Sequence, residues 1–294
     1  MKKSLLFLLF LLPFGSLIGQ PAGPDHQTDL PGPPKIRSEK LNFFIVSKRK
    51  KGQLDLATRF NILRTKCREF FHPRRFISII ARDMEDAVSK MKRNLDARNA
   101  RLGTVWFDSH GSYKKGYSLF YVGTDECNSK SLRDSALSAT LNEINSYCDE
   151  TTSVIIGSCY GGATYSRSSI DYSRTYKMDG DTLMRTLGLY FNGATIYGSE
   201  SWVMSKPGLF NRKPAVGGSP GRKLFLDLCY RPAWENIGKW NSYETRTGQF
   251  TACNTIALDG NGNLVIRGKP YTEEKNINRD ILKNLRKLKP GLYK

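Results

Sequence analysis

Short apolar runs alternate along the chain with stripes of apolar residues at helical spacing. Runs rich in β-branched and aromatic residues predict strands, and they lie at 42–46, 76–80, 103–107, 118–122, 154–156 and 194–197. Apolar positions three and four residues apart predict amphipathic helices, and they lie at 56–67, 84–95, 137–148 and 183–191. This alternation predicts an α/β fold with a mostly parallel central sheet, helices on both faces and right-handed crossovers.

The pattern changes after residue 205. Two apolar stretches, 249–258 and 263–267, flank the sequence Asp-Gly-Asn-Gly at 259–262, which predicts a β-hairpin. A last amphipathic helix is predicted at 277–288, and its outer face is rich in lysine and arginine. We therefore expect residues 206–294 to form a C-terminal extension packed on a core at 41–205.

The N-terminus has the features of an export signal. Two lysines precede a run of leucine and phenylalanine that ends at small residues near Gly19, as in a bacterial secretory signal peptide over 1–19. The run is shorter than the roughly 20 apolar residues that a membrane span needs. Residues 20–40 contain five of the thirteen prolines, which is typical of an extended linker. We expect an exported protein, periplasmic or extracellular, without a membrane span.

The chain is strongly basic, with 46 lysines and arginines against 27 acidic residues and a formal net charge of +19. Such a charge attracts acidic surfaces, polysaccharides or nucleic acid. Contact with a polyanion through the basic surface is therefore one expected partnership. The charge does not indicate a reaction.

Two predicted strands end in residues that carry chemistry. The strand at 103–107 leads to His110-Gly111, and the strand at 154–156 leads to Gly157-Ser158-Cys159, with two glycines shortly after. Open α/β sheets bind ligands at the carboxyl ends of their strands. An imidazole beside a thiol can generate or stabilise a nucleophilic thiolate. The simpler alternatives are that Cys159 is a small buried hydrophobe or half of a disulfide, and that His110 is a polar residue without a reaction.

Several other chemistries lack their sequence signature. No His-Glu-x-x-His or Cys-x-x-Cys pair is present, so we expect neither a zinc site nor another metal or cofactor. The run 157–161 matches the Gly-x-Cys-x-Gly elbow of α/β-hydrolases, but that fold needs a histidine after the nucleophile and none follows Cys159. Six cysteines permit disulfides, although a free Cys159 leaves an odd number for pairing.

A histidine followed about 50 residues later by a cysteine on a neighbouring strand resembles the caspase-like (clan CD) cysteine peptidases, which include gingipains, clostripain and legumain. The resemblance covers roughly 41–205, and exported gingipain-like and clostripain-like members are the closest in kind. It implies a caspase-like α/β/α sandwich, a general base at His110 and a nucleophile at Cys159, with the N–H groups of Gly111 and Cys159 as the oxyanion hole. The caspase motif Gln-Ala-Cys-x-Gly is absent, so cleavage after aspartate is not implied.

The same resemblance implies a substrate pocket built from the loop after the strand at 194–197. There Glu200 would pair with an arginine or lysine of a peptide or protein substrate, while Trp202 packs along its stem. The alternative is a solvated glutamate beside a core tryptophan. For the whole chain, an exported cysteine endopeptidase competes with an inactive caspase-like binding or structural module and with a polyanion-binding secreted protein. The sequence defines neither the natural substrate nor the oligomeric state.

Overall fold

The described part of the chain belongs to one unit that spans residues 37–294. A computed structural model describes residues 39–47, 63, 76–111, 116–164, 166–168, 175–200, 203, 240–253, 256–258 and 261–266. The predicted signal peptide, most of the predicted linker, the closing helix at 277–288 and Trp202 lie outside these residues.

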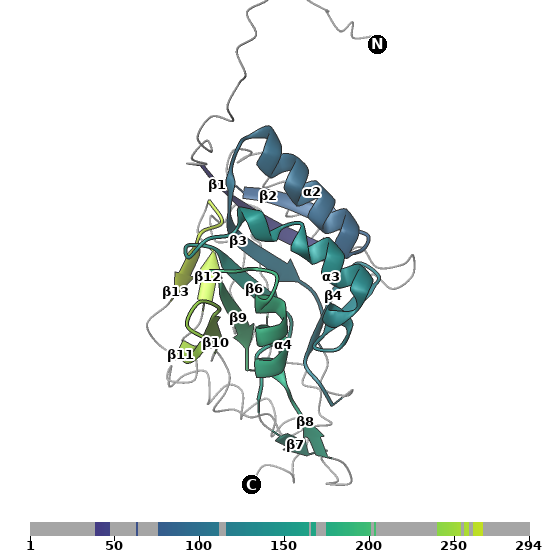
Figure 1. Cartoon of the computed structure of the whole chain (residues 1–294). Coiled ribbons are helices and arrows are strands. Elements are labelled where there is room, and N and C mark those ends of the chain that lie inside the picture. The colour runs from purple at the N-terminus through teal and green to yellow at the C-terminus, as the bar shows by residue number, and fades with distance from the viewer. Residues whose placement is uncertain are drawn as a thin grey trace, which may run out of the picture. The chain divides into compact units, whose positions relative to one another are not determined.

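A seven-stranded sheet organises the fold, in the order β11-β10-β9-β6-β3-β1-β2 (Figure 1). Its strands are β1 (Lys40–Ser47), β2 (Phe76–Ala81), β3 (Arg101–Asp108), β6 (Ser153–Gly157), β9 (Thr195–Ser199), β10 (Trp240–Glu244) and β11 (Gln249–Cys253). The five strands β2, β1, β3, β6 and β9 run parallel to one another, whereas β10 is antiparallel to both β9 and β11. The prediction of a mixed α/β fold with a mostly parallel sheet is confirmed.

The central strands are buried on both faces, as parallel strands usually are. Every residue of β3 from Leu102 to Phe107 is buried, and so are residues 154–157 of β6. Their β-branched and aromatic side chains favour the extended backbone and pack above and below the sheet. This explains why the apolar runs in the sequence are continuous rather than alternating.

Three helices are described: α2 (Met84–Ala97), α3 (Ser135–Asn142) and α4 (Gly180–Gly188). Asp83 caps α2 by accepting a hydrogen bond from the Asp86 N–H, and the predicted apolar stripe of α2 is buried. The α3 helix is shorter than predicted, because the chain changes at Asn142 to a turn and then to the 3-10 helix η2 (Asn145–Tyr147).

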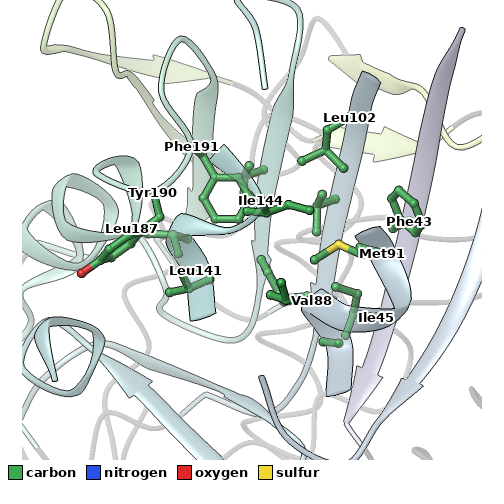
Figure 2. Close-up of a cluster of buried hydrophobic side chains, with 14 of the residues drawn as sticks. Phe43, Ile45, Val88, Met91, Leu102, Leu141, Ile144, Leu187, Tyr190 and Phe191 are labelled. Atoms are coloured by element: carbon green, nitrogen blue, oxygen red, sulfur yellow. The ribbon is translucent and has the colours of Figure 1, made fainter. Parts of the chain in front are cut away.

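Among the described residues, the buried side chains form two clusters on opposite faces of the sheet. The larger cluster joins side chains of β1, β3, β6 and β9 to those of all three described helices, and Figure 2 shows several of them together, including Phe43, Val88, Leu141 and Leu187. The described helices thus pack on this face. Helices on both faces stay a prediction, because two of the predicted helices lie mostly or wholly outside the described residues. The helix predicted at 56–67 lies outside the described residues apart from Leu63, which is helical.

The smaller cluster is covered by a hairpin. It contains Phe44, Trp106 and Trp240 from the sheet together with Ile256 and Leu258, which belong to β12 (Ile256–Leu258). This strand pairs antiparallel with β13 (Leu264–Ile266), so the predicted hairpin is confirmed. The predicted strand at 249–258 is in fact two strands, because 249–253 is β11 of the central sheet. The strands β10 and β11 lie in the range predicted as an extension, and they belong to the sheet itself.

Two further hairpins lie outside the central sheet. One consists of β4 (Leu119–Val122) and β5 (Asp125–Asn128), and the other of β7 (Ser166–Ser168) and β8 (Thr175–Lys177). None of the helices among the described residues combines the length and the apolar character that a membrane crossing requires.

Candidate active site

The two strands that lead to His110 and Cys159 are direct neighbours in the sheet. The strands β3 and β6 run parallel, and the last pair in their register is Asp108 with Gly157. His110 and Cys159 each lie two residues beyond this pair. Both therefore reach the same carboxyl edge of the sheet, at the same height along two adjacent strands.

Gly111 lies directly against the backbone of Cys159. A Cβ atom added at Gly111 would be 2.8 Å from the Cys159 carbonyl carbon and 2.9 Å from its nitrogen, and nearer still to its carbonyl oxygen. No side chain fits into this space, so glycine is required for the approach. The structure thus brings Gly111, the residue after His110, into contact with the backbone of Cys159.

The Cys159 thiol is half-buried and is bound by backbone groups. The N–H of Val203, 44 residues further along the chain, donates to Sγ across 3.4 Å, and Sγ donates toward the Val203 carbonyl oxygen across 3.9 Å. The backbone N–H groups of Gly111 and of Cys159 itself also stabilise negative charge on this sulfur. The two N–H groups expected to form an oxyanion hole therefore both lie near Sγ of Cys159.

The net effect of this environment is to keep the thiol neutral. Burial raises the pKa of Cys159 above its ordinary value, and the charge of Asp108 raises it further. The N–H groups of Val203, Gly111 and Cys159 oppose this shift without cancelling it. The expectation that the surroundings of Cys159 favour the thiolate is therefore not met, because desolvation outweighs the hydrogen bonds.

The chain turns sharply directly after Cys159. Tyr160 has a φ of 63°, a left-handed conformation that a bulky residue rarely adopts, and its side chain is buried. Gly162 then approaches β9 closely: its N–H donates to the Ser199 carbonyl across 2.9 Å, and an added Cβ would overlap the backbone of Gly198. The turn thus carries the chain from the end of β6 to the end of β9.

Glu200 follows β9 at the same edge of the sheet and is half-buried. Burial, together with the charge of Glu200, raises the pKa of Cys253 to about 12, which shows that this carboxylate lies near β11. Trp202, the predicted companion of Glu200 in a substrate pocket, lies outside the described residues, so the pair is not brought together in the described part of the chain.

Three other cysteines belong to the described residues. Cys127, Cys148 and Cys253 are free thiols, and Cys127 is fully buried. Burial raises the pKa of Cys148 to about 12, with Asp149 adding to the shift. Within the described ranges no three His, Cys, Asp or Glu side chains gather as a metal ion would require.

Two residues near the thiol were not identified from the sequence. Asp108 lies two positions before His110, and the strand period of two was a usable signal that both belong to one face. Val203 had no local signal, because its contact with Cys159 depends on how the chain returns after β9.

Comparison of the sequence with family models and with curated proteins finds no match.

Proposed function

We propose that this protein is a cysteine endopeptidase in which His110 and Cys159 act as a catalytic dyad. The observation that carries the proposal is the contact of Gly111 with the Cys159 backbone at the ends of two neighbouring parallel strands. This contact holds an imidazole-bearing segment, a thiol and two N–H donors within one short stretch of the sheet edge. Such an arrangement suits acyl transfer, where a nucleophile, a base and an oxyanion hole must meet at one carbonyl.

The raised thiol pKa specifies how the dyad would work. Because Cys159 rests as a neutral thiol, His110 removes the Sγ proton as the sulfur attacks the scissile carbonyl carbon. The carbonyl electron pair moves to oxygen, where the N–H groups of Gly111 and Cys159 stabilise it. The amine leaves with the proton carried by His110, and a thioester remains. Water, deprotonated by His110, releases the acid and restores the thiol.

The resemblance to caspase-like peptidases supports the same proposal. Histidine precedes cysteine in the chain, the two follow adjacent strands, and the sheet is mostly parallel. The proposed setting is export, on the basis of residues 1–19 alone. Cleavage after arginine or lysine is the finer proposal, and it depends on Glu200 at the end of β9.

An inactive caspase-like domain is the second candidate. The observation that favours it is the Val203 backbone, which already makes hydrogen bonds to the sulfur, together with the raised pKa of the Cys159 thiol. Such a domain would bind a partner without cleaving it. It predicts no loss of any activity when Cys159 is replaced.

Digestion of a diverse peptide library, followed by mass spectrometry, tests the proposal. Wild type is compared with His110→Ala and Cys159→Ala, and with Cys148→Ala as a matched control, because Cys148 is another half-buried free thiol. We expect cleavage by wild type and by the control, and a loss of about a thousandfold or more in both dyad variants. Absence of cleavage by wild type, or equal cleavage by Cys159→Ala, would refute the peptidase.

A further inference from the structure

Three serines at the carboxyl ends of three parallel strands bind the same short strand. Ser47, the last residue of β1, donates through Oγ to the Tyr121 carbonyl across 2.6 Å. Ser109, directly after β3, accepts through Oγ from the Tyr121 N–H across 2.9 Å. Ser158, directly after β6, donates through Oγ to the Leu119 carbonyl across 2.9 Å. The strand β4 therefore lies across the edge where the proposed dyad is found.

Ser109 and Ser158 immediately precede His110 and Cys159, and both lie past the last register pair of β3 and β6. Backbone pairing of the two strands no longer aligns the chain at these positions. The serine hydroxyls tie both segments to β4 there. Ser158 is fully buried, so no water can replace its hydrogen bond to β4, and loss of that bond would leave a buried hydroxyl unpaired.

The Ser109 hydroxyl connects β4 to a peptide group of the site. While accepting from Tyr121, its Oγ donates to the His110 carbonyl oxygen across 3.2 Å. That carbonyl belongs to the same planar peptide unit as the Gly111 N–H, one of the two proposed oxyanion donors. Fixing the direction of the carbonyl therefore fixes the direction of the N–H.

The turn after Cys159 is held from the same side. Ser118, the residue before β4, donates through Oγ to the carbonyl of Tyr160 across 2.9 Å. Its own N–H donates to Asp179 Oδ1 across 2.6 Å, which ties it to the residue that precedes α4. The left-handed conformation of Tyr160 is thus supported by a bond from the segment that also holds Ser109 and Ser158.

From these bonds we infer that Ser109 and Ser158 are positioning residues, which act through β4 to set the spacing of His110 and Cys159 and the direction of the Gly111 N–H. The inference rests on the proposed function, because that function gives these three groups their roles. Ser47 makes the same kind of bond to β4 from a strand that leads to no proposed catalytic group. It is therefore a matched control within the molecule.

The test follows the alkylation of Cys159 by iodoacetamide as a function of pH, quantified on the Cys159 peptide by mass spectrometry. The full chain is compared with Ser109→Ala, Ser158→Ala, Ser109→Thr and the control Ser47→Ala. Because the Gly111 N–H lowers the thiol pKa, a misdirected N–H should move the alkylation midpoint to higher pH by about half to one unit. We expect this shift in Ser109→Ala and Ser158→Ala, its absence in Ser47→Ala, and restoration in Ser109→Thr.

An unchanged midpoint in Ser109→Ala would overturn the inference, and so would an equal shift in Ser47→Ala, which would indicate general loosening of β4. If Ser158→Ala does not fold, the alkylation midpoints of Ser109→Ala and Ser109→Thr still test the inference. The measurement needs no peptide cleavage. A wild type that cleaves nothing therefore refutes the proposed peptidase, while the midpoints separately decide whether the serines position the thiol site.

Discussion

Replacing Gly111 with alanine tests the geometry of the proposed site most directly. The added Cβ would lie 2.8 Å from the carbonyl carbon of Cys159, whereas ordinary contacts begin near 3.4 Å. The carbonyl oxygen of Cys159 would be nearer still, and these backbone atoms cannot rotate away, so the ends of β3 and β6 must separate by about 1 Å or more. Overpacking of this kind costs about 1–3 kcal/mol of unfolding free energy. A displacement of about 1 Å between reacting groups lowers the rate by about a hundredfold.

The assay measures kcat and KM on the best peptide from the library, alongside urea unfolding. Gly248→Ala is the control: it forces alanine into a positive φ of 72° in open space, in the turn between β10 and β11. This strain costs about 1 kcal/mol and leaves the site untouched. We expect Gly111→Ala to lose kcat and Gly248→Ala to retain it. Unchanged kcat and stability in Gly111→Ala would show that the two strand ends do not meet as described.

Three further substitutions test other features. Glu200→Gln should abolish a preference for arginine-terminated and lysine-terminated over asparagine-terminated and aspartate-terminated fluorogenic peptides, and a retained preference would remove Glu200 from the pocket. Burial raises the pKa of Cys127 above 9.0, so its proton stabilises the fold below pH 9 and this contribution is lost as pH rises. Between pH 8 and pH 10, the unfolding free energy measured in urea should fall by about 1.4 kcal/mol less in Cys127→Ala than in wild type. An equal fall in both proteins would contradict this. The Asn42 side chain makes hydrogen bonds with Thr104, Asn261 and Asn263. Asn42→Leu should therefore lower the unfolding free energy by about 2–3 kcal/mol. A decrease under about 0.5 kcal/mol would show that these hydrogen bonds do not hold the β12–β13 hairpin.

Much of the architecture follows from local patterns in the sequence. The sequence predicts the bounds of five strands within a few residues: β1, β2, β3, β6 and β9. A buried parallel strand is recognised by its own continuous apolar run, so its position can be predicted without information from distant segments. The stripe of α2 likewise marks its buried face. The positions of His110 and Cys159 at strand ends could be inferred for the same reason, since each motif directly follows its own strand.

Other features depend on segments that are distant in the sequence. The strand β10 joins β9 across 40 intervening residues, and its sequence Trp-Asn-Ser-Tyr-Glu has no apolar run to mark it as part of a sheet. The position of β4 across three strand ends depends on single hydroxyl groups, which no hydrophobic pattern records.

The state of the thiol was also decided only by the tertiary structure. The sequence indicated a histidine at a neighbouring strand end, and hence a more acidic Cys159. The folded chain instead surrounds this thiol with desolvating neighbours, the Asp108 charge and the backbone of Val203, and the pKa of Cys159 rises. Desolvation depends on all atoms near the sulfur, including those that arrive from 44 residues away, so local sequence determines where the thiol lies but not its protonation.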